Sequence, residues 1–552
     1  MEIINKKDIK FNKKNYNHSI NRLGIMLDRS ELLISILYKC FINGITYVPF
    51  DVNWPCDKIC NIVSEENLNM IITSSKYSNI FKDVELLIVD NKNDVADFYL
   101  SNHDNNIAYI LHTSGSTGKP KGVEITREAL FNFIDGVSEI IDFSDGKRIA
   151  CFTTVSFDIF FLESIMALYK GLTVVLANEE EQRNPRLMVK LIEENNVDMI
   201  QMTPSRMQLL LNHDKELSCL KNVKEIMIGG EPFPLFLLKT LQVKTSAKIF
   251  NMYGPTETTI WSCISDLTEK STIDIGKPIK ETQVYILDEN HNIVPNGNIG
   301  EIAIAGKSLA KGYVNNEKLT NEKFINLPEK PETCIYLTGD LGRYLSDGNL
   351  ECLGRIDNQV KIRGYRVELE EIENLMMQHP NIKKAVASIV ENEDNKSLIA
   401  FYLSDIDIEE NTIKEFLNQK LPEYMVPIIY YHLDELPYTN NDKVDRKQLI
   451  NNYYNHNIKY DKIKTQKNQS ESLTNLELRV LKIICENQDE KFNNNVTINS
   501  SLSDLSIDSI TFIKIIIALE TEFEFEFDDE ILLFTSFPTI KSMIVYIESK
   551  IT

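Results

Sequence analysis

Short apolar runs alternate with segments of helical length from Leu23 to about Leu353. Such runs, separated by helical lengths, are typical of strands that are buried on both faces of a parallel sheet. The alternation therefore predicts an α/β body with largely parallel sheets. The predicted strands include Met70–Thr73, Leu86–Val89, Ile107–Leu111, Thr173–Leu176, Met199–Met202 and Glu225–Ile228.

Two later apolar runs, Gln283–Leu287 and Glu301–Ala305, have a different context. They lie near the dipeptides Asn296-Gly297 and Asp347-Gly348, which are typical of tight turns between antiparallel strands. We therefore expect hairpins in this part of the body.

The length of 552 residues is too great for one compact core. We expect a large body over 1–355, a small mobile α+β lid over 356–450, a polar linker over 451–472 and a small helical-bundle domain over 473–552. The helices of the last domain are expected at Asn475–Glu486, Ser509–Glu522 and Thr539–Ser549, where apolar residues recur every three or four positions.

Charge and cysteine content exclude several classes of protein. The net charge of −22 argues against a nucleic-acid-binding surface. The nine cysteines are scattered without a C-x-x-C pair, as expected for free thiols in a reducing cytosol. The N-terminus lacks the apolar core of a signal peptide, and Lys39 and Asn43 interrupt the apolar stretch Glu31–Phe50. We expect a cytoplasmic protein without a membrane span.

A loop rich in glycine, hydroxyl and lysine residues, Thr113–Gly122, directly follows a predicted strand. Glycines allow a close approach of the backbone, N–H and hydroxyl groups donate hydrogen bonds, and lysines supply charge, so such a loop can bind oxyanions. It is not a Walker loop, because Pro120 follows Lys119 where a hydroxyl residue is needed for magnesium.

The loop resembles the phosphate loop of the adenylate-forming enzymes, specifically the amino-acid adenylation domains of nonribosomal peptide synthetases. The family's other motifs follow in order from about residue 21 to the end of the chain. The resemblance implies activation of a carboxylate by ATP and Mg²⁺, with release of pyrophosphate. Its implied nucleotide-binding residues are Thr113, Ser114, Gly115, Ser116, Thr117, Gly118, Lys121, Gly230, Asn251, Tyr253, Asp340 and Arg355.

The segment Asn251–Glu257 resembles the family's adenine and magnesium motif. By resemblance, Tyr253 stacks on the purine, Asn251 bonds the purine edge, Thr256 contacts phosphate and Glu257 binds the metal through oxygen, as magnesium prefers. We expect Thr256 and Glu257 to act in catalysis.

Two further motifs, Tyr336–Asp340 and Gly354–Gly364, complete the nucleotide site by resemblance. Asp340 accepts both ribose hydroxyls, and Arg355 also reaches the ribose. Asp357 is the implied hinge about which the lid turns between adenylation and thioester formation.

The implied catalytic lysine is Lys443, which would bridge the substrate carboxylate and the nucleotide. A compact ammonium on a long stem suits that task. The family usually has glycine at the preceding position, where this chain has Asp442, an additional carboxylate beside the lysine.

The family's selectivity positions predict the substrate. Asp158 would bind the α-ammonium group of an amino acid, and Trp261, Leu162 and Met252 would fill the space for a side chain. The set resembles that of glycine-activating domains, and a filled pocket rejects larger substrates sterically. Glycine is the expected substrate, with alanine as the nearest alternative. The implied lining is Asp158, Ile159, Leu162, Gln201, Met227, Gly229, Met252, Ile260 and Trp261.

The segment Leu505–Ile510 opens an apolar helix and resembles a carrier-protein attachment site. Ser509 would carry 4′-phosphopantetheine, which requires a phosphopantetheinyl transferase as a partner. Ser506 and Ile507 lie where peptidyl carriers usually have glycines, and this sequence is closer to that of acyl carriers. The acidic run between Glu520 and Glu530 is either a solvated face or a docking surface for partner enzymes.

The sequence therefore predicts a loading module that makes glycyl-AMP and then a glycyl thioester on Ser509. Downstream biosynthetic enzymes would act in trans, since no condensation or thioesterase motif is recognised. The segment that usually begins the large domain is also not recognised. We therefore expect either that the first layer of this domain is smaller than usual or that another chain completes it. The alternatives are an acyl- or aryl-CoA ligase, which Asp158 and Ser509 disfavour, and a catalytically degenerate scaffold that presents the carrier.

Overall fold

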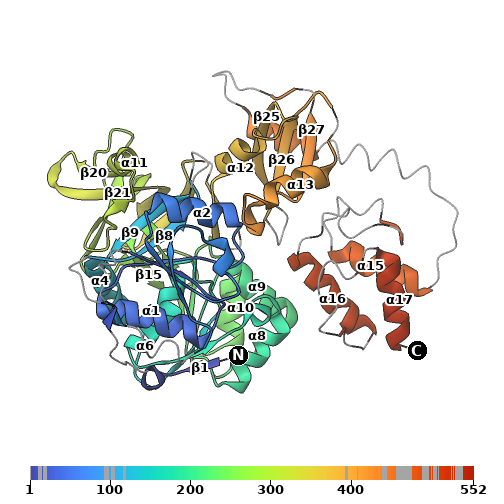
Figure 1. Cartoon of the computed structure of the whole chain (residues 1–552), viewed down its shortest axis with the longest axis horizontal. Coiled ribbons are helices and arrows are strands. Elements are labelled where there is room, and N and C mark those ends of the chain that lie inside the picture. The colour runs from blue at the N-terminus through green and yellow to red at the C-terminus, as the bar shows by residue number, and fades with distance from the viewer. Residues whose placement is uncertain are drawn as a thin grey trace. The chain divides into compact units, whose positions relative to one another are not determined.

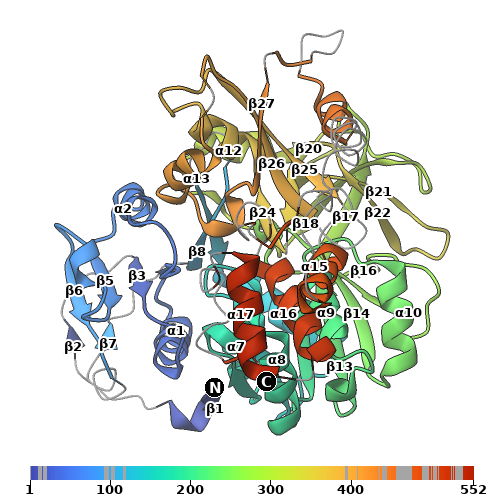
Figure 2. The ribbon, with the colours of Figure 1, turned by 90° about the vertical axis from the view of Figure 1, so that its right-hand side faces the viewer.

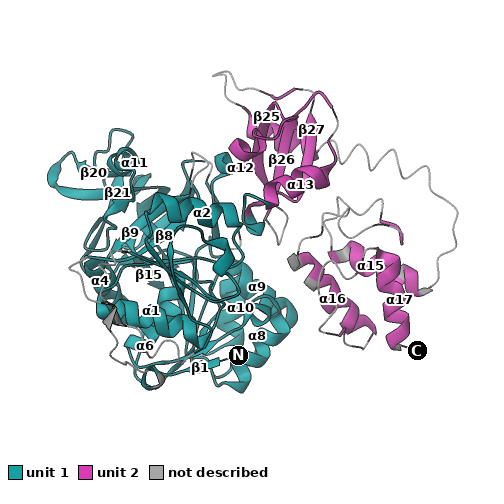
Figure 3. Cartoon of the chain, in the orientation of Figure 1, with its two compact units in different colours: residues 1–371, 419–424 teal, residues 372–418, 425–552 magenta. Residues whose placement is uncertain are grey.

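The structure is a computed structural model with two compact units, Met1–Glu371 with Gln419–Tyr424 and Ile372–Asn418 with Met425–Thr552 (Figures 1 and 3). It describes residues 2–9, 15–16, 22–91, 99–100, 106–115, 120–357, 359–362, 364–391, 396–406, 408–433, 435–437, 444–454, 475–487, 496–498, 500, 507, 509–523, 525, 527–528, 537 and 539–551.

The first unit contains a seven-stranded sheet in which five neighbouring strands, from β8 to the edge strand β6, run parallel. Helix α1 (Glu31–Asn43) begins where the Ser30 side chain accepts a hydrogen bond from the Leu33 N–H, and it ends at Gly44, whose φ of 72° suits glycine. Helices α2 (Cys56–Glu65) and α4 (Arg127–Ser138) also belong to this layer. The strand order is β19 (Gly312–Tyr313), β9 (Lys121–Thr126), β8 (Ile107–Thr113), β4 (Tyr47–Pro49), β3 (Leu23–Met26), β5 (Met70–Thr73) and β6 (Glu85–Ile88).

A second sheet of eight strands has five parallel strands in its interior. Its order is β1 (Glu2–Ile4), β11 (Thr173–Leu176), β10 (Arg148–Cys151), β12 (Met199–Met202), β13 (Glu225–Gly229), β14 (Lys248–Tyr253), β15 (Cys263–Asp266) and β16 (Lys277–Pro278). The helices of this layer are α5 (Ile159–Phe161), the π-helical turn η3 (Leu162–Met166), α6 (Ala167–Tyr169), α7 (Glu179–Arg183), α8 (Pro185–Glu194), α9 (Pro204–His213) and α10 (Leu235–Lys244).

The eight-stranded sheet is buried on both faces. Ile226 and Ile228 of β13 contact one apolar cluster with residues of α8, α9 and α10, which lie beside β13 and β14 in Figure 2. Met227, between them, faces the other cluster, which includes α1 and α4. This alternation explains why β13 is apolar from Ile226 to Ile228, and it leaves the carboxyl ends of the strands as the place where a ligand can bind.

A third, antiparallel sheet follows along the chain in the first unit. It contains β17 (Thr282–Leu287), β18 (Gly300–Gly306), β21 (Lys330–Tyr344), β20 (Phe324–Leu327) and β22 (Leu350–Arg355), with α11 (Glu317–Lys323) before β20. The Asp347-Gly348 turn joins β21 and β22, and Gly348 has a φ of 80°. The hairpin β23 (Val360–Ile362) and β24 (Tyr365–Val367) also belongs to this unit.

Short elements complete the first unit. They are η1 (Lys6–Asp8), β2 (Asn15–Tyr16), η2 (Ser78–Ile80), β7 (Tyr99–Leu100), η4 (Ser218–Leu220) and η5 (Thr256–Thr258).

The second unit comprises an α+β part and a helical part. The α+β part has one sheet of β25 (Lys384–Glu391), β26 (Lys396–Leu403) and β27 (Ile429–Leu433), together with α13 (Glu410–Asn418). The boundary between the two units falls within α12 (Leu369–Met376) and within η6 (Glu423–Met425). The helical part has α15 (Asn475–Asn487), α16 (Ser509–Phe523) and α17 (Ile540–Ile551). Val480, Phe512 and Met543, one from each helix, are buried in a common core.

The predicted fold class is confirmed: a large α/β body with parallel-rich sheets, a small α+β part and a small helical part. The predicted hairpin of the two later runs is the antiparallel pair β17–β18. All nine cysteines are free. The first unit extends to Glu371, beyond the expected end of the body at residue 355, and the predicted domain boundaries remain predictions.

Candidate active site

The predicted phosphate-binding loop lies between β8 and β9, whose ends pair at Thr113 and Lys121. Ser116, Thr117 and Gly118 of the predicted set lie outside the described residues. Ser114 Oγ donates a hydrogen bond to the Arg366 carbonyl oxygen at 2.8 Å. The Gly115 N–H donates to Glu371 Oε2 at 3.1 Å, so a carboxylate of the chain itself occupies a donor that suits a phosphate oxygen.

A buried cluster of charges surrounds the predicted metal ligand Glu257, which is fully buried. Arg366 Nη1 donates to both carboxylate oxygens, at 3.0 and 2.8 Å, and the Tyr313 hydroxyl donates at 2.8 Å. Lys121 Nζ lies 3.9 Å from Glu257 and 3.4 Å from Glu368. Lys121 of the predicted loop and Glu257, the predicted metal ligand, therefore lie close together in the structure.

The charges in this cluster shift each other's ionisation. Burial alone would raise the pKa of Glu257, but Arg366 and Lys121 hold that pKa at about 2. Burial, assisted by the nearby Arg366 guanidinium, lowers the pKa of Lys121 to about 8. Burial raises the pKa of Glu371 to about 7 against the opposing effect of Lys58. Glu257 is thus an anionic oxygen donor at neutral pH, which fits the ligand preference of Mg²⁺.

The residues expected at the ribose, Asp340 on β21 and Arg355 at the end of β22, lie beside Tyr253 at the end of β14. The Tyr253 hydroxyl donates to Asp340 Oδ2 at 2.7 Å, and Arg355 Nη1 donates to Asp340 Oδ1 at 3.0 Å. Arg355 also donates to both oxygens of Asp357, the predicted hinge, at 2.8 and 2.6 Å. Both carboxylates are therefore held in place, and two anionic acceptors face one guanidinium.

Asn251 and Gly230 lie at the carboxyl ends of neighbouring parallel strands. Asn251 Nδ2 donates to the Asp274 carbonyl oxygen at 2.8 Å, which fixes the orientation of the amide. Gly230, directly after β13, has a φ of 88°, a left-handed conformation that favours glycine. Both positions agree with the topological rule that ligands bind at this edge of a parallel sheet.

The predicted substrate-lining residues converge from five segments of the first unit. All of them are buried, and most belong to one apolar cluster. Their positions are Asp158, Ile159 and Leu162 at and after the start of α5, Gln201 on β12, Met227 and Gly229 on β13, Met252 on β14, and Ile260 and Trp261 after η5.

Trp261 fills the space beside Gly229. A Cβ atom placed on Gly229 would lie 2.8 Å from Cη2 of Trp261 and 2.5 Å from the Met252 carbonyl oxygen. Real Cβ atoms do not approach neighbours so closely, so position 229 has room for glycine alone unless its neighbours move. The indole therefore packs directly against the backbone of Gly229.

Asp158 is the carboxylate among these buried side chains, with 9% of its surface exposed. Burial raises its pKa, while a hydrogen bond from the Thr256 hydroxyl lowers it. A carboxylate whose ionised form is destabilised by burial gains from a cationic partner. An α-ammonium group has that chemistry.

Several contacts at the site were not expected from the sequence. Arg366, Glu368 and Glu371 follow directly after the matched motif that ends at Gly364, and Tyr313 comes from β19. The closeness of Arg366 and Glu368 to that motif is a signal that sequence reasoning could have used. No local signal identifies Tyr313 as a partner of Glu257.

Lys443 and Asp442 lie outside the described residues. Ser509 is the first residue of α16, as the sequence predicts for an attachment site at a helix start. Among the described residues, no group of three or more potential metal-binding side chains is present, and no helix is long and apolar enough to cross a membrane.

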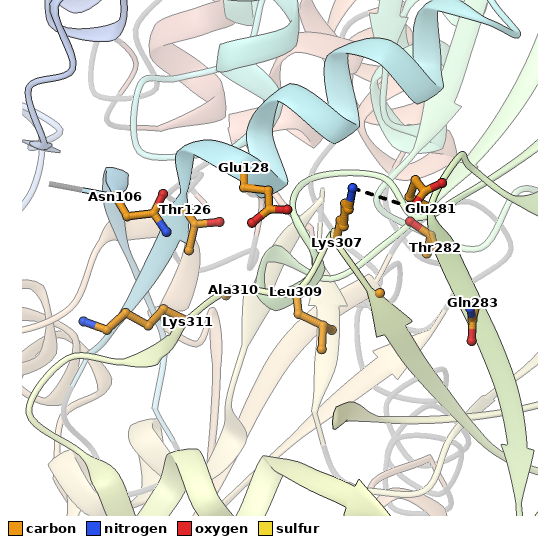
Figure 4. A pocket seen from close by; sticks show the side chains of 11 residues that line it. Asn106, Thr126, Glu128, Glu281, Thr282, Gln283, Lys307, Leu309, Ala310 and Lys311 are labelled. Atoms are coloured by element: carbon orange, nitrogen blue, oxygen red, sulfur yellow. Dashed lines mark ion pairs between the residues drawn. The ribbon is translucent and has the colours of Figure 1, made fainter. Parts of the chain in front are cut away.

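A pocket of about 670 Å³ is lined by other residues (Figure 4). Lys307 and Glu281 on its wall form an ion pair at 3.7 Å. Its lining contains both charge signs and none of the predicted site residues, so it does not compete with the candidate active site. The lining comprises Asn106, Thr126, Glu128, Glu281, Thr282, Gln283, Gly306, Lys307, Leu309, Ala310 and Lys311.

Three family models match the chain in order. They describe an AMP-binding enzyme over residues 19–314, an AMP-binding enzyme C-terminal domain over 371–443 and a phosphopantetheine attachment site over 479–547. The arrangement is that of an adenylation domain fused to a carrier domain.

Curated relatives are nonribosomal peptide synthetases. A dimodular nonribosomal peptide synthase of Bacillus subtilis is 36% identical over 472 residues, 80% of this chain and 20% of the relative. Tyrocidine synthase 1 of Brevibacillus parabrevis is 33% identical over 443 residues, 77% of this chain and 40% of the relative. This chain thus spans less than half the length of either.

Solved structures are similar in fold. A nonribosomal peptide synthetase protein with adenylation and PCP domains, bound to a vinylsulfonamide inhibitor, has a TM-score of 0.77 at 22% identity, with 96% of this chain and 88% of that chain covered. A four-domain nonribosomal peptide synthetase bound to AMP and glycine has a TM-score of 0.55 at 28% identity, with 96% and 39% covered.

Proposed function

This chain belongs to the family of AMP-binding enzymes, and we propose that it activates a small amino acid, glycine in the first place, and loads it onto its own carrier domain. In the first step a carboxylate oxygen of the amino acid attacks the α-phosphorus of ATP, and pyrophosphate leaves. In the second step the thiol of phosphopantetheine on Ser509 attacks the acyl carbon, loses its proton, and AMP leaves.

One observation carries the choice of substrate. The predicted substrate lining contains one buried carboxylate, that of Asp158. In the same lining, the Trp261 indole packs directly against the backbone of Gly229. A protonated primary amine has the charge to pair with Asp158, and the space filled by Trp261 would exclude larger substrate side chains sterically. Glycine fits both conditions, and alanine is the next smallest candidate.

The chain's own residues would distribute the negative charge of the reaction. Glu257 would bind Mg²⁺, which supplies charge neutralisation at the phosphates. Lys121 and the Gly115 N–H lie at the loop where phosphate oxygens would bind, and Asp340 with Arg355 would hold the ribose. Lys443 would bridge the substrate carboxylate and the nucleotide. Positioning and electrostatics carry most of the catalysis in such transfers.

Nucleotide binding requires a rearrangement around the loop. The Gly115 N–H already donates a hydrogen bond to Glu371, and Glu257 already accepts hydrogen bonds from Arg366. Phosphates and Mg²⁺ would compete for the same donor and the same acceptor, so both side chains must leave these contacts when ATP binds. The proposed hinge at Asp357 lies close before them in the sequence.

The relatives support an amino acid as the substrate class. The curated relatives are nonribosomal peptide synthetases, and the four-domain synthetase at 28% identity was solved with AMP and glycine. Loading of the carrier would depend on a phosphopantetheinyl transferase and would serve downstream enzymes acting in trans.

The test is amino-acid-dependent exchange of pyrophosphate into ATP, with the full chain and each amino acid separately. We expect exchange with glycine above all others. Asp158→Asn keeps the shape but removes the charge, and should lower kcat/KM for glycine on the order of 100-fold. Asp135→Asn, on an exposed part of α4, is the matched control and should leave exchange unchanged. Folded protein without exchange for any amino acid would contradict the proposal and favour a degenerate scaffold.

A further inference from the structure

The turn that leads into Trp261 has an unusual backbone. Thr259 and Ile260 have φ values of 62° and 67°, in the left-handed region. They are the only two consecutive non-glycine residues with positive φ in the described part of the chain, and both are β-branched. A β-branched residue in this region is strained, and such strain persists only where the surroundings enforce it.

A buried hydrogen bond holds the strained turn. Thr259 Oγ1 donates to the Ser308 carbonyl oxygen at 2.7 Å, and both residues are fully buried. The Ser308 hydroxyl is in turn held by Asn132 Nδ2 at 3.0 Å and by the Thr282 hydroxyl at 2.6 Å. The anchor for Thr259 is therefore itself fixed by two side chains from other segments.

The exit from the turn is equally constrained. The Ser262 N–H donates to the Tyr253 carbonyl oxygen at 2.8 Å. A Cβ atom on Gly254 would lie 2.8 Å from Trp261 Cα and 2.6 Å from the Ile260 carbonyl oxygen, so the returning chain lies directly on Gly254. With the backbone fixed on both sides of Trp261, the indole has little freedom to leave the wall at Gly229.

We propose that Thr259 is a positioning residue for substrate selection, whose hydroxyl on the Ser308 carbonyl maintains the left-handed turn that holds Trp261 against Gly229. The inference rests on the proposed function of the same pocket. Thr259 is not among the lining residues predicted from the sequence, and it acts through Trp261 without touching the substrate.

Two substitutions at position 259 distinguish anchoring of a strained turn from simple packing. Valine at position 259 keeps the volume and the strain but removes the anchor, so the turn should relax and Trp261 should move. Glycine removes the anchor and the strain together, because it adopts positive φ at no steric cost. Anchoring against strain therefore predicts that Thr259→Val disturbs selection more than Thr259→Gly. A packing role predicts the opposite order, since glycine leaves the larger cavity.

The experiment measures kcat/KM for glycine and for alanine in pyrophosphate exchange, with the full chain. Thr259→Val should raise the alanine-to-glycine ratio about tenfold, Thr259→Gly clearly less, and Thr259→Ser should restore the wild-type ratio. The KM for ATP should stay within about twofold, as expected for a change confined to the amino-acid pocket. If the valine variant does not fold, Thr259→Ala replaces it, because alanine is also strained at positive φ and should disturb the ratio more than glycine.

Thr46→Val is the matched control. Thr46 is 1% exposed and its hydroxyl donates to the Ile107 carbonyl oxygen at 2.6 Å, so the same bond is removed elsewhere in the body. This control should lower the melting temperature without moving the ratio. An unchanged ratio in Thr259→Val, a larger shift in the glycine variant, or an equal shift in Thr46→Val would overturn the inference. Wild-type protein without exchange would instead refute the proposed function itself.

Discussion

The indole of Trp261 and the Cα of Gly229 meet so closely that a methyl group on Gly229 would lie 2.8 Å from Cη2. The two residues come from different elements, one from the turn after η5 and one from the end of β13. In the proposed amino-acid pocket, this contact would close the side toward which a substrate side chain extends.

Trp261→Leu tests this closure. Removal of the ring edge opens space beside Gly229, so kcat/KM for alanine should rise at least about tenfold relative to that for glycine in pyrophosphate exchange. The buried ring also stabilises the fold, and a lower melting temperature is expected. Unchanged selectivity in a folded variant would contradict the assignment of Trp261 to the pocket wall.

Tyr253→Phe removes the hydroxyl that donates to Asp340 at 2.7 Å. A hydrogen bond to a charged acceptor contributes about 1.5–3 kcal/mol, so the KM for ATP should rise about tenfold or more, with a smaller effect on the KM for glycine. Tyr344→Phe is the control, because the Tyr344 hydroxyl donates at 3.0 Å to the Val284 carbonyl oxygen in the antiparallel sheet. Equal KM values for ATP in wild type and Tyr253→Phe would show that Asp340 does not need this contact.

The raised pKa of Glu371 predicts that the stability of the first unit depends on pH. Burial raises its pKa from 4.5 to about 7, so the folded state binds the proton more tightly than the unfolded state does. The stability of the first unit should therefore fall as the pH rises from about 4.5 to 7, and the cost is fully present above that range. Glu371→Gln should flatten this part of the profile.

The measurement is the thermal midpoint of the first unit between pH 4.5 and 8, in wild type and in Glu371→Gln. Glu269→Gln, an exposed change in the same unit, is the control and should follow the wild-type profile. A variant whose profile also follows that of wild type would mean that Glu371 is not the group responsible.

Ser509→Ala separates the two proposed steps. The side chain that would carry phosphopantetheine is lost, while the first unit is untouched. Exchange of pyrophosphate should remain at the wild-type rate, and neither a pantetheine adduct nor an aminoacyl adduct should appear by intact-protein mass spectrometry. An adduct on Ser509→Ala after treatment with a phosphopantetheinyl transferase would place the attachment site elsewhere.

The parallel strands could be predicted because their signals are local. Three of the four residues in each of Met70–Thr73 and Met199–Met202 are apolar, and the strands have these bounds in the structure. A mostly apolar run this short, between segments of helical length, favours a buried strand over a helix. The nucleotide residues were assigned from the family's motifs and the pocket residues from its selectivity positions, both by resemblance, and the structure brings many of them together.

The contacts that decide the geometry could not be predicted in this way. Arg366 pairs with Glu257 over a sequence separation of 109 residues, and no pattern within either segment indicates the other. Thr259 and Ile260 adopt positive φ although β-branched residues disfavour it, so local propensity argues against the observed turn. Tertiary contacts at Ser308 and Gly254 override that propensity, and they become visible only in three dimensions.

The most direct test of the proposed substrate is intact-protein mass spectrometry of the pantetheinylated full chain, incubated with ATP, Mg²⁺ and an equimolar mixture of the amino acids. The pocket closed by Trp261 and Gly229 predicts a mass increase of one glycyl group on the carrier. An increase that corresponds to a larger amino acid would contradict this account of the pocket.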